Sequence, residues 1–208
     1  MRAFVIAMEK EADAVRPHLG PGDRLYVSGV GKVNAAAAAQ RAVCDGATEI
    51  LNAGVAGGLG ADMDVADVYE IGRAVEYDFD LSEENGTEAG VHNERTTPYF
   101  ALRTTGLFPA KTLGTGDRFS DSVADLPLLG RLGVGVRDME GAAVAHVAET
   151  NGVPCRALKC ITNVVGRGAT DAYEKNLARA LKRLGEALAE WVALDSESAV
   201  LVNYAPIR

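Results

Sequence analysis

The stretch RDMEGA at residues 137–142, together with Asn163 at the end of the next apolar run, decides how this chain is interpreted. Glu140 places a carboxylate where an irregular segment becomes a helix, because residues 141–150 are almost wholly small and apolar. A carboxylate accepts two hydrogen bonds at once, which suits a vicinal diol, and an amide suits the edge of a heteroaromatic base. With Glu11 near the N-terminus as a third polar group, the three residues are typical of a site that cleaves nucleosides, although Glu11 taken alone is more simply a solvated glutamate in the first turn of a helix.

Strands and helices are predicted to alternate on both sides of this stretch. Short apolar runs predict strands at residues 3–7, 25–30, 49–53, 65–74, 111–114, 133–136 and 154–161. Helical patterning predicts helices at residues 9–18, 32–43, 141–150 and 173–194. Residues 76–100 are polar and weakly patterned, which predicts a long loop near the site. This alternation predicts an α/β sheet whose two faces are covered by helices.

The composition limits the classes of protein that fit. The 208 residues contain no linker or repeat, which predicts a single domain over 1–208, and the apolar segment 196–208 is expected to pack on the core or on a second subunit. A formal charge of −8 without a basic cluster argues against nucleic acid as a partner. No apolar run approaches the ~20 residues that span a bilayer, and no signal-peptide pattern occurs. We therefore expect a soluble, cytoplasmic protein with no membrane partner.

The cysteines and histidines show no metal-binding pattern. Cys44 and Cys155 lie in apolar contexts and are expected to be buried free thiols. His146 lies inside a predicted helix and is expected to be a core or interface residue, whereas His18 and His92 have no partners at a recognisable spacing. Because Cys-x-x-Cys and His-Glu-x-x-His motifs are absent, the spacing predicts no metal site.

Two glycine-rich segments follow predicted strands. Gly29 and Gly31 match the first two glycines of a dinucleotide fingerprint, but Asn34 replaces the third and Val33 excludes a Walker loop, so we predict no nucleotide cofactor. This turn opens a helix and is expected to present free N–H groups to an anion or a hydroxyl. Segment 54–60 carries further glycines directly behind a buried strand, so we expect its backbone to line the ligand crevice.

Five motifs occur in a characteristic order along the chain. They are AMEKEA at 7–12, SGVGKVNA at 28–35, NAGVAGGL at 52–59, TGDRF at 115–119 and DMEGAAVA at 138–145. This order resembles the purine nucleoside phosphorylase/nucleosidase family, with the methylthioadenosine/adenosylhomocysteine nucleosidase branch nearest. The resemblance implies a single three-layer α/β/α domain around a central mixed, partly barrel-like sheet. It also implies a homo-oligomer, a nucleoside as ligand, and no metal or organic cofactor.

The resemblance also assigns roles residue by residue. Glu11 matches the acid/base that activates water, and Glu140 with Met139 matches the pair that binds the ribose. Phe119 matches the aromatic that stacks on the base, and the backbone of Ser120 is expected to meet the purine edge. The remaining substrate-binding positions that the motifs imply are Met8, Val55, Ala56, Gly57 and Asp138.

Asn163 departs from the nucleosidase branch, which carries an aspartate at this position. Asparagine offers one acceptor and one N–H donor group, which match the N7–H donor and the O6 acceptor of a departing 6-oxopurine. Departing adenine presents two donors side by side, so one amine would face another. A mismatched buried polar group costs about 1–3 kcal/mol, roughly 5- to 150-fold in rate. Asn163 therefore predicts a hypoxanthine-type nucleoside as the substrate.

The substrate class narrows further because the phosphorylases of the family carry a phosphate-binding loop where this chain has a carboxylate, Glu11. A 6-oxopurine nucleosidase resembles the futalosine hydrolases of menaquinone biosynthesis, which would release hypoxanthine and dehypoxanthinyl futalosine. Arg95, Arg118 and Arg167 are candidates to bind the carboxylate of futalosine. Two alternatives stay open: a methylthioadenosine/adenosylhomocysteine nucleosidase, and a non-catalytic nucleoside-binding protein.

Overall fold

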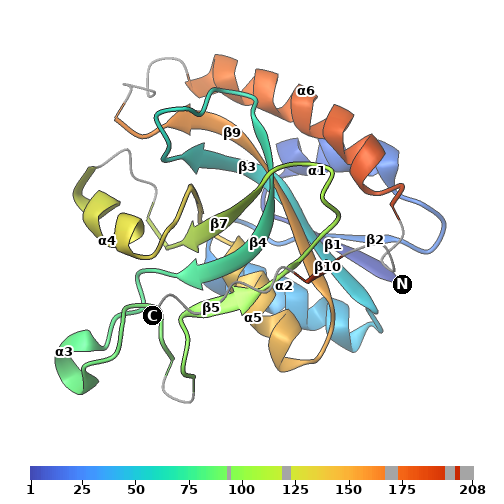
Figure 1. Cartoon of the computed structure of the whole chain (residues 1–208). Helices are drawn as coiled ribbons and strands as arrows, with labels where there is room; N and C mark the ends of the chain where they lie inside the picture. The colour runs from blue at the N-terminus through green and yellow to red at the C-terminus, as the bar shows by residue number, and fades with distance from the viewer. Residues whose placement is uncertain (93–94, 119–122, 167–172, 195–199, 202–208) are drawn as a thin grey trace.

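The computed structural model describes residues 1–92, 95–118, 123–166, 173–194 and 200–201 (Figure 1). Its strands are β1 (Arg2–Ile6), β2 (Arg24–Val27), β3 (Glu49–Gly58), β4 (Val68–Glu76), β5 (Tyr99–Ala101), β6 (Arg103–Thr104), β7 (Ala110–Thr115), β8 (Val136–Asp138), β9 (Cys155–Val164) and β10 (Val200–Leu201). Its α-helices are α1 (Glu9–Val15), α2 (Lys32–Cys44), α3 (Ser82–Asn85), α4 (Leu126–Arg131), α5 (Gly141–Thr150) and α6 (Tyr173–Trp191). Two short 3₁₀ segments, Arg16–His18 and Val123–Asp125, extend α1 and precede α4.

Eight of the strands form one mixed sheet that partly closes on itself. The strand order is β2-β1-β3-β8-β7-β4-β5, and β9 pairs with both β3 and β4. The strands β3, β8, β7, β4 and β9 therefore form a ring in which β3–β9, β4–β7 and β7–β8 are parallel, while β3–β8 and β4–β9 are antiparallel. The mixed, partly barrel-like α/β/α fold expected from the resemblance is confirmed.

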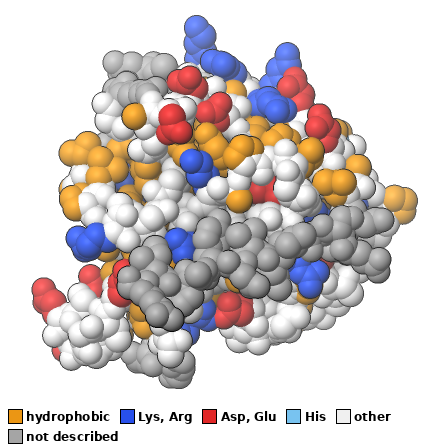
Figure 2. All heavy atoms as spheres, viewed as in Figure 1, with side chains coloured by type: hydrophobic (Ala, Val, Ile, Leu, Met, Phe, Trp, Pro, Cys, Tyr) orange, Lys and Arg blue, Asp and Glu red, His pale blue; other side chains and the backbone are white. Residues whose placement is uncertain are grey.

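Helices cover the sheet from two sides. On one side α1 and α6 pack on β1, β3 and β9, and α6 contributes the buried side chains of Ala180, Leu184 and Trp191. On the other side the alanine-rich faces of α2 and α5 pack on each other and on the sheet, and Figure 1 shows the two pairs on opposite sides. Acidic and basic side chains stand close together where α6 runs, at the top of Figure 2. No helix within the described part of the chain has the length and apolar character to cross a membrane.

Two strands run further than their composition predicts. β3 continues through the glycines to Gly58 and β9 continues to Val164, because the two strands pair with each other in parallel over almost their whole length. Segment 54–58, expected to be a loop, is therefore strand, although it does line the pocket described below. Ladder hydrogen bonds and burial on both sides outweigh the weak strand propensity of glycine here.

Some expectations from the sequence were wrong. The helix α4 was missed, and the predicted loop 76–100 contains α3 and most of β5. Strand β8 begins at Val136 rather than at residue 133. Cys44 is exposed rather than buried, because it lies on the outer face at the end of α2, whereas Cys155 is buried as expected. Most of segment 196–208 lies outside the described residues, apart from β10, which pairs with β6.

Candidate active site

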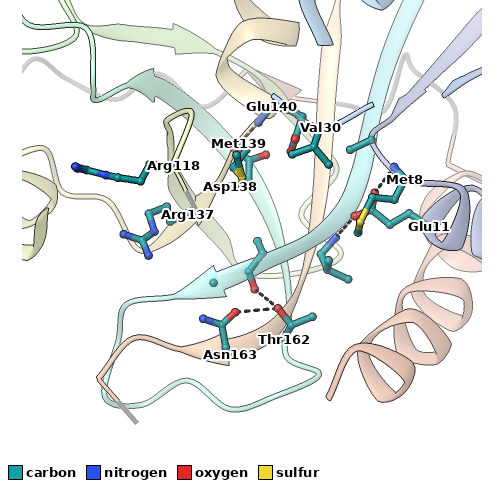
Figure 3. A pocket seen from close by; sticks show the side chains of 14 residues that line it. Met8, Glu11, Val30, Arg118, Arg137, Asp138, Met139, Glu140, Thr162 and Asn163 are labelled. Atoms are coloured by element: carbon teal, nitrogen blue, oxygen red, sulfur yellow. Dashed lines mark hydrogen bonds between the residues drawn. The ribbon is translucent and has the colours of Figure 1, made fainter. Parts of the chain in front are cut away.

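One pocket collects residues from the ends of several strands, as expected for ligand sites of α/β sheets. Figure 3 shows Glu11 on one side of this pocket, Glu140 above it, and Arg137 and Asn163 on the side away from Glu11. The closed sheet brings these groups together although they lie far apart in the sequence. The described residues that line the pocket are Ala7, Met8, Glu11, Val30, Val55, Ala56, Gly57, Arg118, Arg137, Asp138, Met139, Glu140, Thr162 and Asn163.

Glu11 is fixed by backbone hydrogen bonds to both of its oxygens. Its Oε2 accepts the N–H of Met8 at 3.0 Å and its Oε1 accepts the N–H of Val55 at 2.8 Å. Glu11 lies on α1, one turn after β1, so the N-terminal end of this helix carries the carboxylate to the pocket. A Cβ at Gly54 would come within 2.6 Å of Oε1, so the glycine is required for this approach. The carboxylate is therefore held in one orientation.

Glu140 is oriented by the turn that opens α2. Its Oε1 accepts the N–H of Gly31 at 2.8 Å, and among the described residues none donates to its other oxygen. Gly31 has a φ of 104°, a conformation that favours glycine. The next N–H, that of Lys32, binds the carboxylate of Asp117 at 2.7 Å. The expectation that this turn presents free N–H groups to a ligand was therefore wrong, because side chains of the protein already bind both.

A buried ion pair between Lys159 and Asp138, which sequence reasoning missed, stabilises the segment that holds Glu140 at the start of α5. Lys159 Nζ lies 2.8 Å from Asp138 Oδ2, and both side chains are almost fully buried. Asp138 also accepts the N–H of Gly141 at 2.8 Å and the hydroxyl of Thr115 at 2.5 Å, which anchors the start of α5. The signal in the sequence was Lys159 itself, which with Arg156 is one of two charges within an otherwise apolar strand, because such a charge is buried only with a partner.

Burial raises the pKa of both pocket glutamates. For Glu11 desolvation raises the pKa, while the N–H of Val55 and the charge of Lys159 oppose the shift. For Glu140 desolvation raises the pKa to about 7, and the neighbouring charge of Asp138 adds to this effect. Shifted carboxylates in a pocket are typical of catalytic acids and bases.

Asn163 reaches the pocket through an irregularity in β9. The register between β3 and β9 shifts so that Ala56 pairs with Ile161 and Gly57 pairs with Asn163. Thr162 is thereby left over, and it lines the pocket together with Asn163 although neighbouring strand residues normally point to opposite faces. The Thr162 hydroxyl lies 3.0 Å from Asn163 Oδ1, which turns the amide N–H groups away from Thr162, and no described residue accepts from them.

Arg137 is a pocket residue that sequence reasoning did not single out. Gly57 pairs with Arg137 on β8 and with Asn163 on β9. Residues paired directly across strands point to the same face of the sheet, so the side chains of Arg137 and Asn163 flank Gly57, which has no side chain to separate them. The Arg137 side chain is 6% exposed and its Nη1 lies 3.6 Å from Asp125 Oδ2. Within the described residues this Nη1 has no hydrogen-bond partner. A buried guanidinium with an unused donor is a candidate ligand-binding group.

Not every predicted position can be placed. Phe119, Ser120 and Arg167 lie outside the described residues. Arg118 lines the pocket, with its side chain 63% exposed and paired with Asp125. Arg95 does not line it, because its guanidinium binds Glu149 and the carbonyl of Tyr99. Among the described residues, the one cluster of His, Cys, Asp or Glu with metal-binding geometry is Glu76, His92 and His146, outside the pocket lining.

Comparisons with known proteins agree with this architecture. The Phosphorylase superfamily profile matches residues 24–193. The 5′-methylthioadenosine/S-adenosylhomocysteine nucleosidase of Treponema pallidum (strain Nichols) is 29% identical over 198 residues, covering 76% of this chain and 74% of its own. Solved structures of the nucleosidase of that name and of futalosine hydrolase, both from Helicobacter pylori, each have a TM-score of 0.83 at 20% identity, covering 92% of this chain and 97% of theirs.

Proposed function

The chain belongs to the phosphorylase superfamily, and from this premise we propose that it hydrolyses the N-glycosidic bond of a 6-oxopurine nucleoside. The nucleosidase activity itself is supported by relatives at the level of sequence and of fold. The finer proposal is that the substrate is futalosine, with hypoxanthine and dehypoxanthinyl futalosine as products. It also includes a homo-oligomeric assembly and no metal or cofactor in the reaction.

The observation that carries the 6-oxopurine proposal is the pair of donors beside Gly57. Among the described residues none accepts from the amide N–H groups of Asn163 in the pocket, and Arg137 adds a guanidinium whose Nη1 has no hydrogen-bond partner among them. A purine placed over Gly57 would lie between them. The carbonyl O6 of hypoxanthine accepts from such donors, whereas the exocyclic amine of adenine would face further N–H groups.

The carboxylates supply the chemistry in this proposal. Glu11 takes a proton from water as the water oxygen bonds to C1′ and the C1′–N9 bond breaks, with its electrons passing into the purine. Glu140 accepts hydrogen bonds from the ribose hydroxyls through the oxygen that Gly31 does not occupy. The negative charges of Glu11 and Glu140 also favour the positive charge that develops on the ribose. N7 of the departing purine takes a proton from solvent water, and Asn163 Oδ1 then accepts a hydrogen bond from N7–H.

Hydrolysis fits the pocket better than phosphorolysis does. Phosphate would have to approach C1′ beside Glu11, whose two oxygens already occupy the N–H groups of Met8 and Val55. Glu140 occupies the N–H of Gly31, a further donor that an anion would need. A carboxylate at these positions repels phosphate and activates water instead.

A second candidate is the 5′-methylthioadenosine/S-adenosylhomocysteine nucleosidase activity that the Treponema pallidum relative is named for. It would use the same two glutamates but would require Asn163 to turn its oxygen toward the exocyclic amine of adenine. The third reading, a non-catalytic nucleoside-binding protein, is disfavoured because Glu11 and Glu140 are both present and oriented.

Product analysis by chromatography tests these alternatives. The protein is incubated with futalosine, inosine and methylthioadenosine, each in phosphate-free buffer and with phosphate added. We expect hypoxanthine from futalosine at the same rate with and without phosphate. Adenine from methylthioadenosine as the main product would support the second candidate, phosphate dependence would contradict hydrolysis, and binding without any product would support the non-catalytic protein.

A further inference from the structure

Glu76, His92 and His146 meet outside the pocket although they come from three distant segments. Glu76 is the last residue of β4, His92 lies between α3 and β5, and His146 is in the middle of α5. One carboxylate oxygen and one nitrogen from each histidine all lie within 4.8 Å of one another. The spacing of these residues in the sequence predicts no metal site, because the fold alone brings them together.

The distances within this cluster approach those of a coordinated transition metal. Glu76 Oε1 lies 3.0 Å from His146 Nδ1 and 3.8 Å from His92 Nε2. Ligands at 2.0–2.1 Å from a tetrahedral zinc ion are about 3.3 Å apart, so small side-chain rotations would bring both pairs with Glu76 to that separation. The two histidine nitrogens, which lie within 4.8 Å of each other, would have to approach to the same distance. Two imidazoles and one carboxylate also form an established zinc ligand set, which leaves a fourth position for water.

Aromatic packing holds both imidazole rings in place. His92 stacks on Phe79 with ring centroids 4.0 Å apart, and His146 stacks on Phe100 at 4.4 Å. The two imidazoles meet edge to face at 4.8 Å. His92 Nε2 is buried and, within the described part of the chain, has no hydrogen-bond partner. A buried nitrogen without a partner, aimed at a carboxylate, is accounted for by a ligand between them.

The positive side chains near the cluster are paired with other carboxylates, so a cation beside Glu76 is electrostatically compatible. Lys32 Nζ lies 3.6 Å from Glu76 Oε2 but only 2.5 Å from Asp78 Oδ1, so Asp78 balances the charge of Lys32. Arg95, above the ring of Phe100, is paired with Glu149. Lys32 thus binds the far oxygen of Glu76, and the near oxygen faces the two histidines. His146 is also the most exposed of the three ligands, at 36%, which provides an entry path for an ion.

We propose that Glu76, His92 and His146 bind one divalent transition-metal ion of the zinc type, with water as the fourth ligand. The ion links the end of β4 and the segment before β5 to α5, so its role is to fix these three elements to one another. The proposal concerns a site outside the pocket and does not depend on which nucleoside the pocket cleaves.

Zinc titration of the protein tests the proposal. After treatment with EDTA and dialysis, ZnCl₂ is added in a calorimeter, and we expect one ion per chain. The variants His92→Gln and His146→Gln should each weaken binding by more than the roughly 10- to 100-fold that loss of an outer partner costs. At a hundredfold excess over Kd the melting temperature should rise by roughly 5–10 °C in the parent protein.

His18→Gln is the matched control, because it removes the one other histidine of the chain and should leave zinc binding unchanged. Cobalt(II) gives a second measurement that does not depend on stability, since tetrahedral histidine ligation produces a visible absorption band. The band should be present in the parent and in His18→Gln, and absent from His92→Gln and His146→Gln. Zinc binding that is undetectable in the parent, or equal in all four proteins, would overturn the proposal.

Discussion

The two ends of the pocket differ in whether their polar groups already have hydrogen-bond partners. At the carboxylate end, defined by Glu11 and Glu140, acceptor groups are held by backbone N–H donors at 2.8–3.0 Å. At the donor end, defined by Arg137 and Asn163, N–H groups point into the pocket and some have no partner among the described residues. The carboxylate end is therefore positioned before any ligand binds. At the donor end, a bound ligand would supply the acceptors that the unpaired N–H groups need.

This difference separates catalysis from specificity. Preformed carboxylates with raised pKa values suit proton transfer and the stabilisation of a developing positive charge. Unpaired donors bind a ligand with acceptor groups more tightly than a ligand with donor groups, because burying a polar group without a partner costs free energy. Changes at the carboxylate end should then lower the rate for every nucleoside, and changes at the donor end should alter the preference between nucleosides.

The largest effect is expected at Glu11. Glu11→Gln keeps the shape but removes the base, so kcat should fall by roughly 10²- to 10⁴-fold for all substrates. Because burial raises the pKa of Glu11, kcat/KM of the parent should decline on the acid side at a pH above 4.5 as this group gains a proton. Steady-state rates across pH measure both effects. Glu9→Gln, exposed on the same helix, is the control, and a Glu11→Gln variant near the parent rate would contradict the assignment.

The second effect is on stability, through Glu140. Its pKa is raised from 4.5 to about 7 in the folded protein, so the folded state binds the proton more tightly than the unfolded chain does. The resulting stabilisation is complete below pH 4.5 and is lost as pH rises through about 7, a change on the order of 3 kcal/mol. Urea unfolding of the parent at pH 5 and pH 8 should show this decrease in the free energy of unfolding.

Glu140→Gln should remove the part of this pH dependence that comes from Glu140, because glutamine does not titrate, and should leave the part of the same sign that comes from Glu11, whose pKa burial also raises. Glu190→Gln, exposed on α6, should keep it. Equal pH dependence in the parent and in Glu140→Gln would mean that burial does not shift this carboxyl as described.

The sequence predicted the carboxylate end better than the donor end. Glu11 and Glu140 lie in short motifs at the start of helices, which single them out in the sequence, although the N–H groups of Val55 and Gly31 that orient them come from distant segments. Arg137 acquires its place only when β8 pairs with β3 across Gly57, a contact between segments 80 residues apart that no local pattern encodes. The fold class was likewise predictable from alternating strands and helices.

Strand ends were less predictable for the same reason. The stretch from Gly54 to Gly58 has the composition of a loop, and it becomes strand only because β9 provides a matching edge. The cluster of Glu76, His92 and His146 is a further case, in which each histidine alone carried no signal. Groups made by pairing between distant strands and helices become visible only in the structure.

Asn163→Asp tests the donor end and should reverse its preference. Aspartate accepts hydrogen bonds where asparagine donates, so cleavage of methylthioadenosine should gain relative to that of futalosine or inosine. The expected change in the ratio of kcat/KM values is roughly 5- to 150-fold, the cost of one mismatched buried polar group. Asn163→Ala is the control, because it removes donor and acceptor together and should slow both classes of substrate. An unchanged ratio in Asn163→Asp would show that Asn163 does not read position 6 of the purine.

The smallest effect is expected at Arg137, whose charge Asp125 already partly balances at 3.6 Å. Arg137→Met keeps much of the buried side-chain volume but removes the donors that face the base. Loss of one charged hydrogen bond at the weak end of its range lowers kcat/KM for the 6-oxopurine nucleoside by about 10-fold. Cleavage of methylthioadenosine should change little, so the ratio of the two rates is the measurement. Arg118→Met is the control, measured with inosine as the 6-oxopurine nucleoside, because this arginine is 63% exposed in the same pocket and neither inosine nor methylthioadenosine carries the carboxylate it is a candidate to bind. An equal loss for both substrates in Arg137→Met would assign Arg137 to the packing of β8 and leave Asn163 as the residue that distinguishes the bases.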